Sequence, residues 1–203
     1  MAEHSIVQAG VTAEDTEDFN RLFVISAPKF VPALYGGIHE RVNRNLYRYR
    51  GNVLSYEHTR FMRVDGKNAG MIVAYDWKQN KSQQTKTTLL ILRYMRARFM
   101  KQARHLQWAG QELGKMDDGT YYIACLAFYE EFRNQGLGAE IMAHTQETAV
   151  KAGCTKLSLD AETYNTDAIR FYKRFGMAEA GEPRGTTIGG EYFEFIRLSK
   201  DIK

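Results

Sequence analysis

A short segment in the second half of the chain has the residue types needed to hold an anion. Arg133-Asn134-Gln135-Gly136-Leu137-Gly138-Ala139 follows an apolar stretch and opens a stretch with helical spacing. Glycines allow close backbone approach, and the first amides of a helix lack intrahelical partners and lie at the positive end of its dipole. The arginine adds a planar charged donor. The segment therefore predicts a cradle for a pyrophosphate.

Other catalytic and phosphate-binding motifs do not fit. A dinucleotide fingerprint needs a third glycine where Ile141 stands, and no Gly-Lys-Ser/Thr follows the glycines. There is no Gly-x-Ser-x-Gly elbow and no His-Glu-x-x-His. The five histidines and two cysteines show no metal-ligand spacing, so we expect no metal, and we expect Cys125 to be a core residue rather than a nucleophile.

The composition indicates a folded domain of moderate size. Of 203 residues, 44% are hydrophobic, which is enough for a core and argues against disorder. The net charge of +4 points only weakly to acidic partners. Neither a signal peptide nor a membrane-spanning run is present, so we expect a cytoplasmic protein with reduced cysteines and no membrane partner.

Hydrophobic spacing predicts strands and helices on either side of the Arg133 segment. The expected elements before it are a strand over 5–7, a helix after Thr12 with a capping box to Asp15, a helical stretch over 30–50 broken at Gly36-Gly37, a hairpin of strands 59–64 and 69–77, and a strand over 121–128. Those after it are a helix over 136–152, a strand over 155–161, a helix over 167–175, and strands over 177–181 and 191–198 joined through Gly189-Gly190. This order predicts a mixed α/β fold with a partly parallel sheet.

Residues 78–116 form a basic segment, which we expect to be one long helix or two shorter ones. Between positions 78 and 104 it has no acidic residue and eight basic ones, namely Lys78, Lys81, Lys86, Arg93, Arg96, Arg98, Lys101 and Arg104. It has three interpretations: a lid over the cleft, a surface for an acidic partner or nucleic acid, or an oligomer contact that would make a homodimer. Few aromatic residues interleave, which disfavours nucleic acid.

Two motifs resemble those of a known family. Arg133-x-x-Gly136-x-Gly138 resembles the acetyl-CoA pyrophosphate loop of the GNAT superfamily of N-acetyltransferases. Asn165-x-x-Ala168-x-x-x-Tyr172-x-x-x-Gly176-Met177 is similar to the second signature of that family, which usually ends in Phe where Met177 stands. The resemblance is specific over residues 120–180. It implies a single domain over 1–203 with a GNAT-like fold: a central, splayed, mostly antiparallel sheet, helices on both faces, and 78–116 as a helical insertion.

The resemblance also implies a role for each matching residue. Backbone groups of Leu126, Ala127 and Phe128 would pair with the pantetheine arm, admitted by a splay between this strand and residues 156–161. Amides of Arg133, Asn134, Gln135, Gly136, Leu137, Gly138 and Ala139 would hold the pyrophosphate. Asn165 would hydrogen-bond the pantetheine or the strand end, and Tyr172 would protonate the departing thiolate.

The implied activity is direct attack of a primary amine on acetyl-CoA, with a small amine, an antibiotic or a protein amine as acceptor. A backbone N–H near Phe128 would stabilise the oxyanion. Asp160, Glu162, Glu57 and His58 are candidate bases because they lie near strand ends, and Asp160 and Glu162 share a strand face that could attract a cation. The alternatives are a non-catalytic acyl-CoA-binding or regulatory module, which would not need Tyr172, and a nucleic-acid-binding protein acting through residues 78–104.

Overall fold

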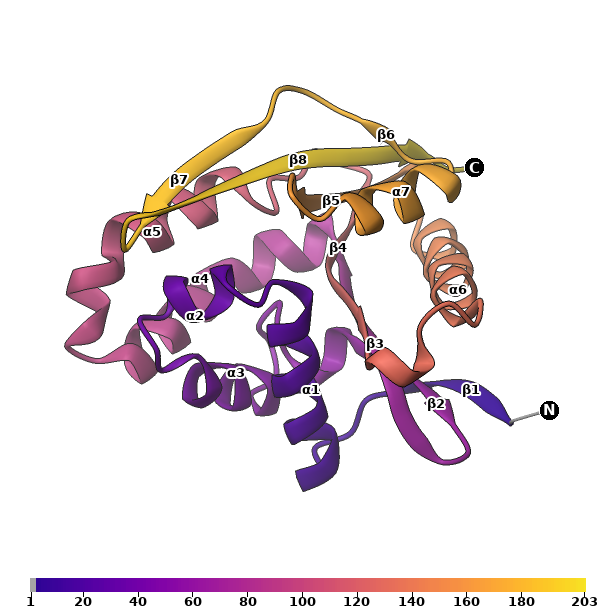
Figure 1. Cartoon of the computed structure of the whole chain (residues 1–203), viewed down its shortest axis with the longest axis horizontal. Helices are drawn as coiled ribbons and strands as arrows, with labels where there is room; N and C mark the ends of the chain where they lie inside the picture. The colour runs from indigo at the N-terminus through magenta and orange to yellow at the C-terminus, as the bar shows by residue number, and fades with distance from the viewer. Residues whose placement is uncertain (1–2) are drawn as a thin grey trace.

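An eight-stranded sheet crosses the molecule, with neighbouring strands in the order β1-β2-β3-β4-β5-β8-β6 and β7 paired to β8 (Figure 1). The computed structural model describes residues 3–203. Its strands are β1 (His4–Gln8), β2 (Thr59–Val64), β3 (Lys67–Asp76), β4 (Thr120–Phe128), β5 (Lys156–Glu162), β6 (Ala178–Glu179), β7 (Arg184–Ile188) and β8 (Glu191–Asp201). Only β4 and β5 pair in parallel, and the other neighbours are antiparallel. The expected mixed, mostly antiparallel sheet is confirmed.

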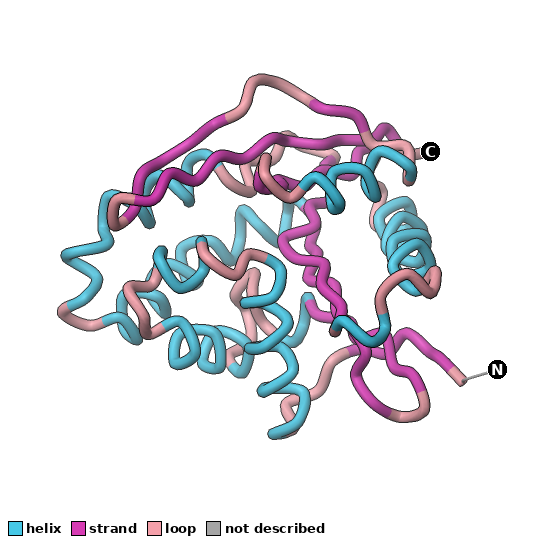
Figure 2. Tube along the Cα trace, viewed as in Figure 1, coloured by secondary structure: helices cyan, strands magenta, loops and turns pink. Residues whose placement is uncertain are grey.

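Helices cover the two faces of the sheet in two groups, as the colouring by secondary structure also shows (Figure 2). The first group is α1 (Ala13–Ser26), α2 (Phe30–Leu34), α3 (His39–Arg48), α4 (Trp77–Met95) and α5 (Arg98–Glu112), and the second is α6 (Leu137–Lys151) and α7 (Thr166–Arg174). Each group has its own core cluster. On β2, Phe61 packs into the first cluster and its neighbour Met62 into the second. Alternating side chains thus bury both faces of the central strands.

Local capping explains where the first helices begin. The Thr12 hydroxyl accepts from the Asp15 amide at 3.0 Å, which confirms the cap of α1. The expected capping box is incomplete, because the Asp15 carboxylate accepts from the Gly10 amide instead of the Thr12 amide. At Asp76 a capping box with Gln79 ends β3 and starts α4. Trp77 is therefore the first residue of a helix and not the last residue of the predicted strand.

The basic segment forms two helices rather than one. Between them Arg96 has a positive φ of 53°, which ends α4, and α5 begins at Arg98. The pair extends outward on the side of α2 and α3 (Figure 1). Trp108 of α5 reaches back to the sheet, with its ring 6.1 Å from that of Phe195 on β8.

The prediction for the C-terminal strands was wrong in one respect. Gly189 and Gly190, both at positive φ, join β7 to β8, whereas the predicted partner over 177–181 is reduced to the two-residue β6. Strand β7 was missed because Arg184-Gly185-Thr186-Thr187 shows no apolar alternation. Its backbone pairs with β8 from Arg184↔Phe195 to Ile188↔Glu191.

A glycine on β3 sets the position of the end of β4. Gly70 lies opposite Phe128, and a Cβ at Gly70 would overlap the Phe128 ring. We expect Gly70→Ala to lower the free energy of unfolding by about 1–3 kcal/mol, because the ring must move in a packed interior. Urea unfolding measures this.

The matched control is Gly110→Ala in α5. A Cβ there meets nothing within 4 Å, and alanine in an exposed helix should raise stability by up to about 1 kcal/mol. If the two variants were equally stable, the Phe128 ring could move aside without a cost in stability.

Candidate active site

The two parallel strands at the centre of the sheet separate part-way along their length. Pairing between β4 and β5 covers Thr120–Ile123 with Lys156–Leu159 and then stops, although β4 continues to Phe128 and β5 to Glu162. Beyond that point β4 stays with β3, and β5 stays with β8. This is the splay expected between the two strands.

The free edge of β4 presents backbone groups that no other strand pairs. The Tyr129 amide donates to the Ala69 carbonyl on the β3 side at 3.0 Å. Since successive residues of a strand direct their backbone groups to opposite sides, Phe128 and Leu126 direct theirs away from β3, toward the gap. Ala127, between them, faces β3. Leu126 and Phe128 could therefore pair with an added extended chain, as a further strand would.

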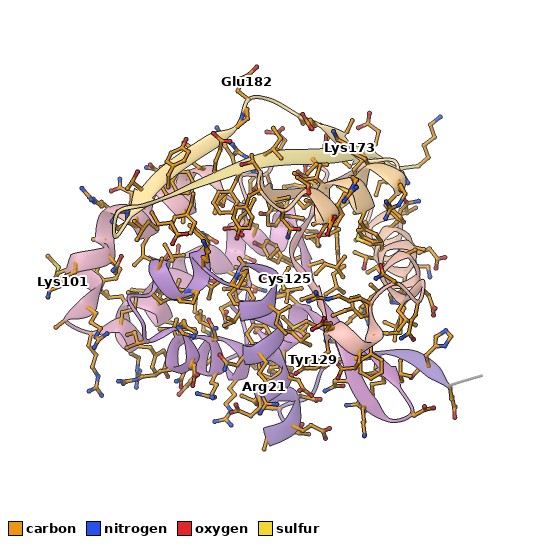
Figure 3. The ribbon with its side chains drawn as sticks, viewed as in Figure 1. Arg21, Lys101, Cys125, Tyr129, Lys173 and Glu182 are labelled. Atoms are coloured by element: carbon orange, nitrogen blue, oxygen red, sulfur yellow. The ribbon has the colours of Figure 1, made fainter. Side chains whose placement is uncertain are left out.

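A cavity of about 250 Å³ occupies the gap between the separated strands. Its walls come from β4, from the end of β5, from α7, from the connection between α1 and α2, and from the residues after α5. They include Cys125, Glu162, Asn165 and Tyr172, which are far apart in the sequence. Figure 3 places Cys125 in the interior of the molecule.

The Arg133 segment has an open set of amides at the start of α6. Gly136 caps the helix with φ 83°, and Asn134 also has a positive φ of 60°. The amides of Arg133 and Ala139 donate to Glu130 and Gly136 carbonyls. Among the described residues 3–203, the backbone amides of residues 134–138 have no hydrogen-bond acceptor. Arg133 is exposed, and its Nε donates to the Phe128 carbonyl at 3.1 Å, so the side chain also links the loop to β4.

Asn165 and Tyr172 lie at the other side of the gap, on α7. Asn165 caps this helix, because its Oδ1 accepts from the Ala168 amide at 3.2 Å. Its own amide donates to the Glu162 carbonyl at 2.9 Å, which ties α7 to the end of β5. Tyr172 is 8% exposed and lines the cavity. Burial raises the pKa of the Tyr172 phenol, so it keeps its proton at neutral pH.

Glu162 is the carboxylate in the cavity wall that lacks a full set of partners. It is 5% exposed, and its Oε2 accepts from the Tyr164 hydroxyl at 2.6 Å. Its Oε1 is buried without any hydrogen-bond partner among the described residues. Burial raises the pKa of Glu162, opposed by the Tyr164 hydrogen bond. A buried, under-partnered carboxylate of this kind is suited to accept a proton.

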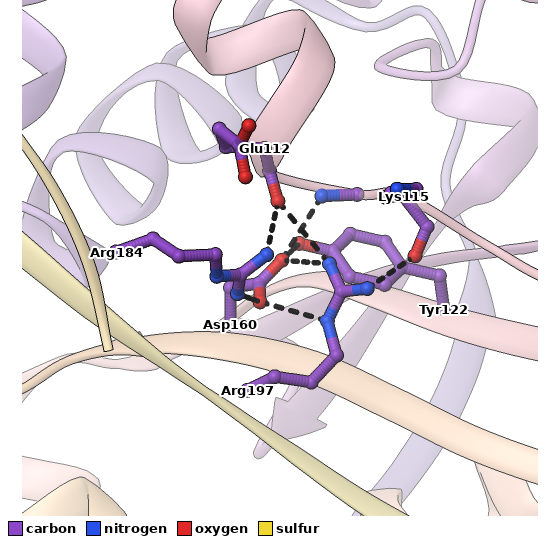
Figure 4. Close-up of polar contacts among 7 residues, drawn as sticks. Glu112, Lys115, Tyr122, Asp160, Arg184 and Arg197 are labelled. Atoms are coloured by element: carbon purple, nitrogen blue, oxygen red, sulfur yellow. Dashed lines mark hydrogen bonds and ion pairs between the residues drawn. The ribbon is translucent and has the colours of Figure 1, made fainter. Parts of the chain in front are cut away.

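Asp160 lies on the same strand face but in a different environment (Figure 4). Arg184 donates to its Oδ1 at 2.5 Å, and Arg197 donates to both of its oxygens at 3.0 and 2.9 Å. The Gly114 amide and the Tyr122 hydroxyl donate to Oδ2, each at 3.0 Å. Burial acts to raise the pKa of Asp160, but hydrogen bonds and charge from Arg197 outweigh it and the pKa is lowered.

The two other candidate bases lie away from the cavity. Glu57 and His58 line a separate polar hollow of about 180 Å³ beside α6. Glu57 accepts from the Gly51 amide, and His58 Nε2 is 2.7 Å from Gln83 Oε1. Burial raises the pKa of the Cys125 thiol to about 12, so this cysteine is not a thiolate nucleophile at neutral pH.

Sequence reasoning did not find Arg184 and Arg197, although both are central to the site. They lie on β7 and β8, and they also donate to the carbonyl of Glu112 at the end of α5. The alternation of Arg197 with apolar residues along β8 was the only signal, and it does not identify a partner at residue 160. Among the described residues, no helix is long and apolar enough to cross a membrane.

Comparisons with known proteins support the geometry. A family model described as the acetyltransferase (GNAT) family matches residues 37–177, more than half of the chain. This chain belongs to the acetyltransferase (GNAT) family. The match includes the Arg133 loop, Tyr172 and the two basic helices. The resemblance drawn from the two motifs is thus confirmed at the level of family and fold.

Individual GNAT relatives match shorter stretches. The chain is 35% identical over 72 residues to an acetyltransferase of Agrobacterium fabrum, which covers 36% of this chain and 51% of that protein. It is 31% identical over 64 residues to a thialysine N-epsilon-acetyltransferase of Bos taurus, covering 32% and 38%. The matches thus span about half, or less, of the length of these curated relatives.

Solved GNAT structures show the same fold over the whole chain. An N-acetyltransferase from Staphylococcus aureus Mu50 has a TM-score of 0.65 at 19% identity, covering 97% of this chain and 100% of its own. An acetyltransferase of Bacillus subtilis, solved in complex with CoA, has a TM-score of 0.54 at 11% identity, with both chains fully covered.

The ion pairs of Asp160 predict a stability effect. We expect Asp160→Asn to cost about 3–5 kcal/mol at neutral pH, because it leaves Arg184 and Arg197 partly buried without an anion. Since the folded-state pKa of Asp160 is lowered, its contribution is present above the ordinary carboxyl pKa and is lost below about pH 4. The difference in free energy of unfolding between the variant and the parent should therefore become smaller in acid. Urea unfolding at several pH values would measure this.

The control is Asp118→Asn. Asp118 pairs with Lys81 at 2.7 Å, but both side chains are more than 60% exposed, so the change should stay within about 1 kcal/mol. An equally small effect at Asp160 would contradict the assigned role.

Proposed function

We propose that the chain transfers an acetyl group from acetyl-CoA to the nitrogen of a primary amine. The observation that carries this is the convergence, in one cavity, of the unpaired edge of β4, the phenol of Tyr172 and the under-partnered carboxylate of Glu162. In a member of this family, these three groups would supply the cofactor-binding edge, the general acid and the general base that acyl transfer to an amine requires.

The residues around the gap fit coenzyme A. The amides of 134–138 at the start of α6 would hold the pyrophosphate, assisted by Arg133, while those of Arg133 and Ala139 are already engaged. Leu126 and Phe128 would pair with the pantetheine arm along β4, and Asn165 would reach it from α7. When bound, the thioester supplies the acetyl group.

Glu162 is our candidate for the general base. A lysine-like amine with a pKa of about 10.4 costs roughly 4–5 kcal/mol to deprotonate at pH 7. Glu162 lines the cavity and its Oε1 has no competing donor, so the carboxylate can take that proton. Asp160, held by two arginines, we assign to positioning rather than to proton transfer.

Two other groups would complete the reaction. The Phe128 amide, directed into the gap, would donate to the oxyanion, and losing such a donor costs on the order of 3 kcal/mol in related sites. The new C–N bond forms as the C–S bond breaks, and Tyr172 would protonate the sulfur. Its high pKa ensures that the proton is present. One proton per turnover is released to solvent.

The remaining expectations stay as proposals. We retain a cytoplasmic location, and a homodimer remains an expectation. A non-catalytic acyl-CoA-binding module would use the Arg133 loop and the free edge of β4 but would not need Tyr172. We disfavour this alternative because Tyr172 and Glu162 line the same cavity. The nucleic-acid alternative would need the basic helices to bind strands, and we disfavour it because few aromatic residues interleave with their basic side chains.

The phenol can be tested by Tyr172→Phe. We expect CoA affinity by calorimetry to change by less than threefold, and thiol release to fall at least tenfold because the leaving thiolate loses its acid. Tyr121→Phe is the matched control, since Tyr121 is equally buried at 8% but lies outside the cavity. Unchanged turnover in Tyr172→Phe would remove this residue from the mechanism.

The base can be tested by Glu162→Gln. We expect turnover at pH 7 to fall by about 10²–10⁴-fold. The parent should lose activity as pH falls through the raised pKa of Glu162, and the variant should lack this limb. Because a raised carboxyl pKa means that the ionised form is disfavoured in the folded state, the variant should be at least as stable as the parent at pH 7. Glu57→Gln, in the separate hollow, should retain both activity and pH limb. The reverse pattern would identify Glu57 as the base.

A further inference from the structure

The cavity has one free charge, and its other walls are mostly apolar with a few neutral polar groups such as Ser26 and Asn165. Seven buried side-chain nitrogen or oxygen atoms in residues 3–203 lack a partner, and only Glu162 Oε1 belongs to a residue that lines this cavity. The other acidic wall residue, Asp160, is neutralised by two arginines. Around them the walls are aromatic and aliphatic, and include Phe30, Leu34 and Leu113. A ligand with several cationic groups would find a partner for only one of them.

An ion pair near Glu162 links the α1–α2 connection to the β7–β8 hairpin. Lys29, between α1 and α2, pairs with Glu191 at the tip of the β7–β8 hairpin at 2.9 Å. Beneath this pair, the Phe30 ring packs edge-on against Phe193 and Phe195, with centroids 5.4 and 4.8 Å away. The ion pair is exposed and therefore weak. Phe30 and Phe195 belong to the cavity wall, so the rings give this side of the cavity an apolar surface.

The size of the cavity gives a scale for the body of the acceptor. Its volume is about 250 Å³, which must also accommodate the end of the pantetheine arm beside Tyr172. An apolar cavity of roughly 150 Å³ is enough to hold benzene. The remaining space thus suits a body of about one ring or a short alkyl chain.

We propose that the acceptor is a small primary monoamine with an apolar aliphatic or aromatic body, its ammonium group on Glu162 Oε1 and its body against α2 and the end of α5. This inference rests on the proposed acetyl transfer and names its acceptor class. It sets aside polycationic acceptors, which lack carboxylate partners in the cavity.

The test is thiol release from acetyl-CoA by the full-length chain with a panel of amines. The panel contains n-hexylamine and 2-phenylethylamine, the polar monoamine ethanolamine, the polyamine spermidine, and a short lysine-containing peptide. We expect kcat/KM for the two apolar amines to exceed that for each of the others at least tenfold. A peptide or spermidine that matches them would overturn the inference.

A pair of leucine variants locates the specificity. Leu34→Ala enlarges the cavity at α2, and should raise the ratio of kcat/KM for n-octylamine over n-butylamine at least threefold. Leu46→Ala, in the same core cluster but outside the cavity wall, is the matched control and should leave the ratio unchanged. If neither variant changes the ratio, the acceptor body does not lie against α2 and the inference is wrong.

Calorimetry with CoA separates failure of the acceptor class from failure of the function. If CoA binds and thiol is released only with the peptide or spermidine, acetyl transfer stands and the acceptor class is overturned. If CoA does not bind, the proposed function falls and the acceptor assignment with it.

Discussion

The loss of pairing between β4 and β5 is the constraint on which the other features of the site depend. A backbone donor or acceptor buried without a partner costs about as much as a lost hydrogen bond, so a sheet does not separate unless each half is held elsewhere. Here β4 is held by β3, and β5 by β8, on either side of the gap. The gap is thus preformed, and an extended ligand backbone can satisfy groups that no strand of the protein reaches.

Asp160 keeps the second half of the sheet in place at the point where the strands separate. It joins β5 to β7 through Arg184 and to β8 through Arg197, and both arginines also donate to the Glu112 carbonyl at the end of α5. One buried carboxylate therefore fixes the end of α5 and, with it, the cavity-wall residues Leu113 and Gly114 that follow (Figure 4). The basic side chains of α4 and α5 are exposed, as Lys101 is (Figure 3), and none of them lies in the cavity wall.

Much of this site could be predicted from local sequence, because its parts are local signals. The Arg133 loop, the α6 helix and the Asn165–Tyr172 spacing each lie within one short segment, and α6 and α7 begin and end close to the expected residues. The distinction between Asp160 and Glu162 could not be predicted. Because Asp160 and Glu162 are two residues apart, the sequence places both on one face of the strand. Only the long-range pairing in the structure shows that Arg184 and Arg197 reach Asp160 and not Glu162. Strand β7 was missed for a similar reason. Its sequence is polar, and the strand forms because its backbone pairs with β8.

The opposite environments of these two carboxylates also determine what the cavity can do with an amine. In water, the gap in pKa between an ammonium and a carboxylic acid strongly opposes proton transfer. Burial narrows this gap from both sides, because it disfavours the ammonium and the carboxylate alike. Glu162 already shows the raised pKa expected from burial, while Asp160, with its pKa lowered by Arg197, would widen the gap if it were the base. A carboxylate two residues from a doubly paired aspartate can thus be the better proton acceptor because it has been left with fewer partners.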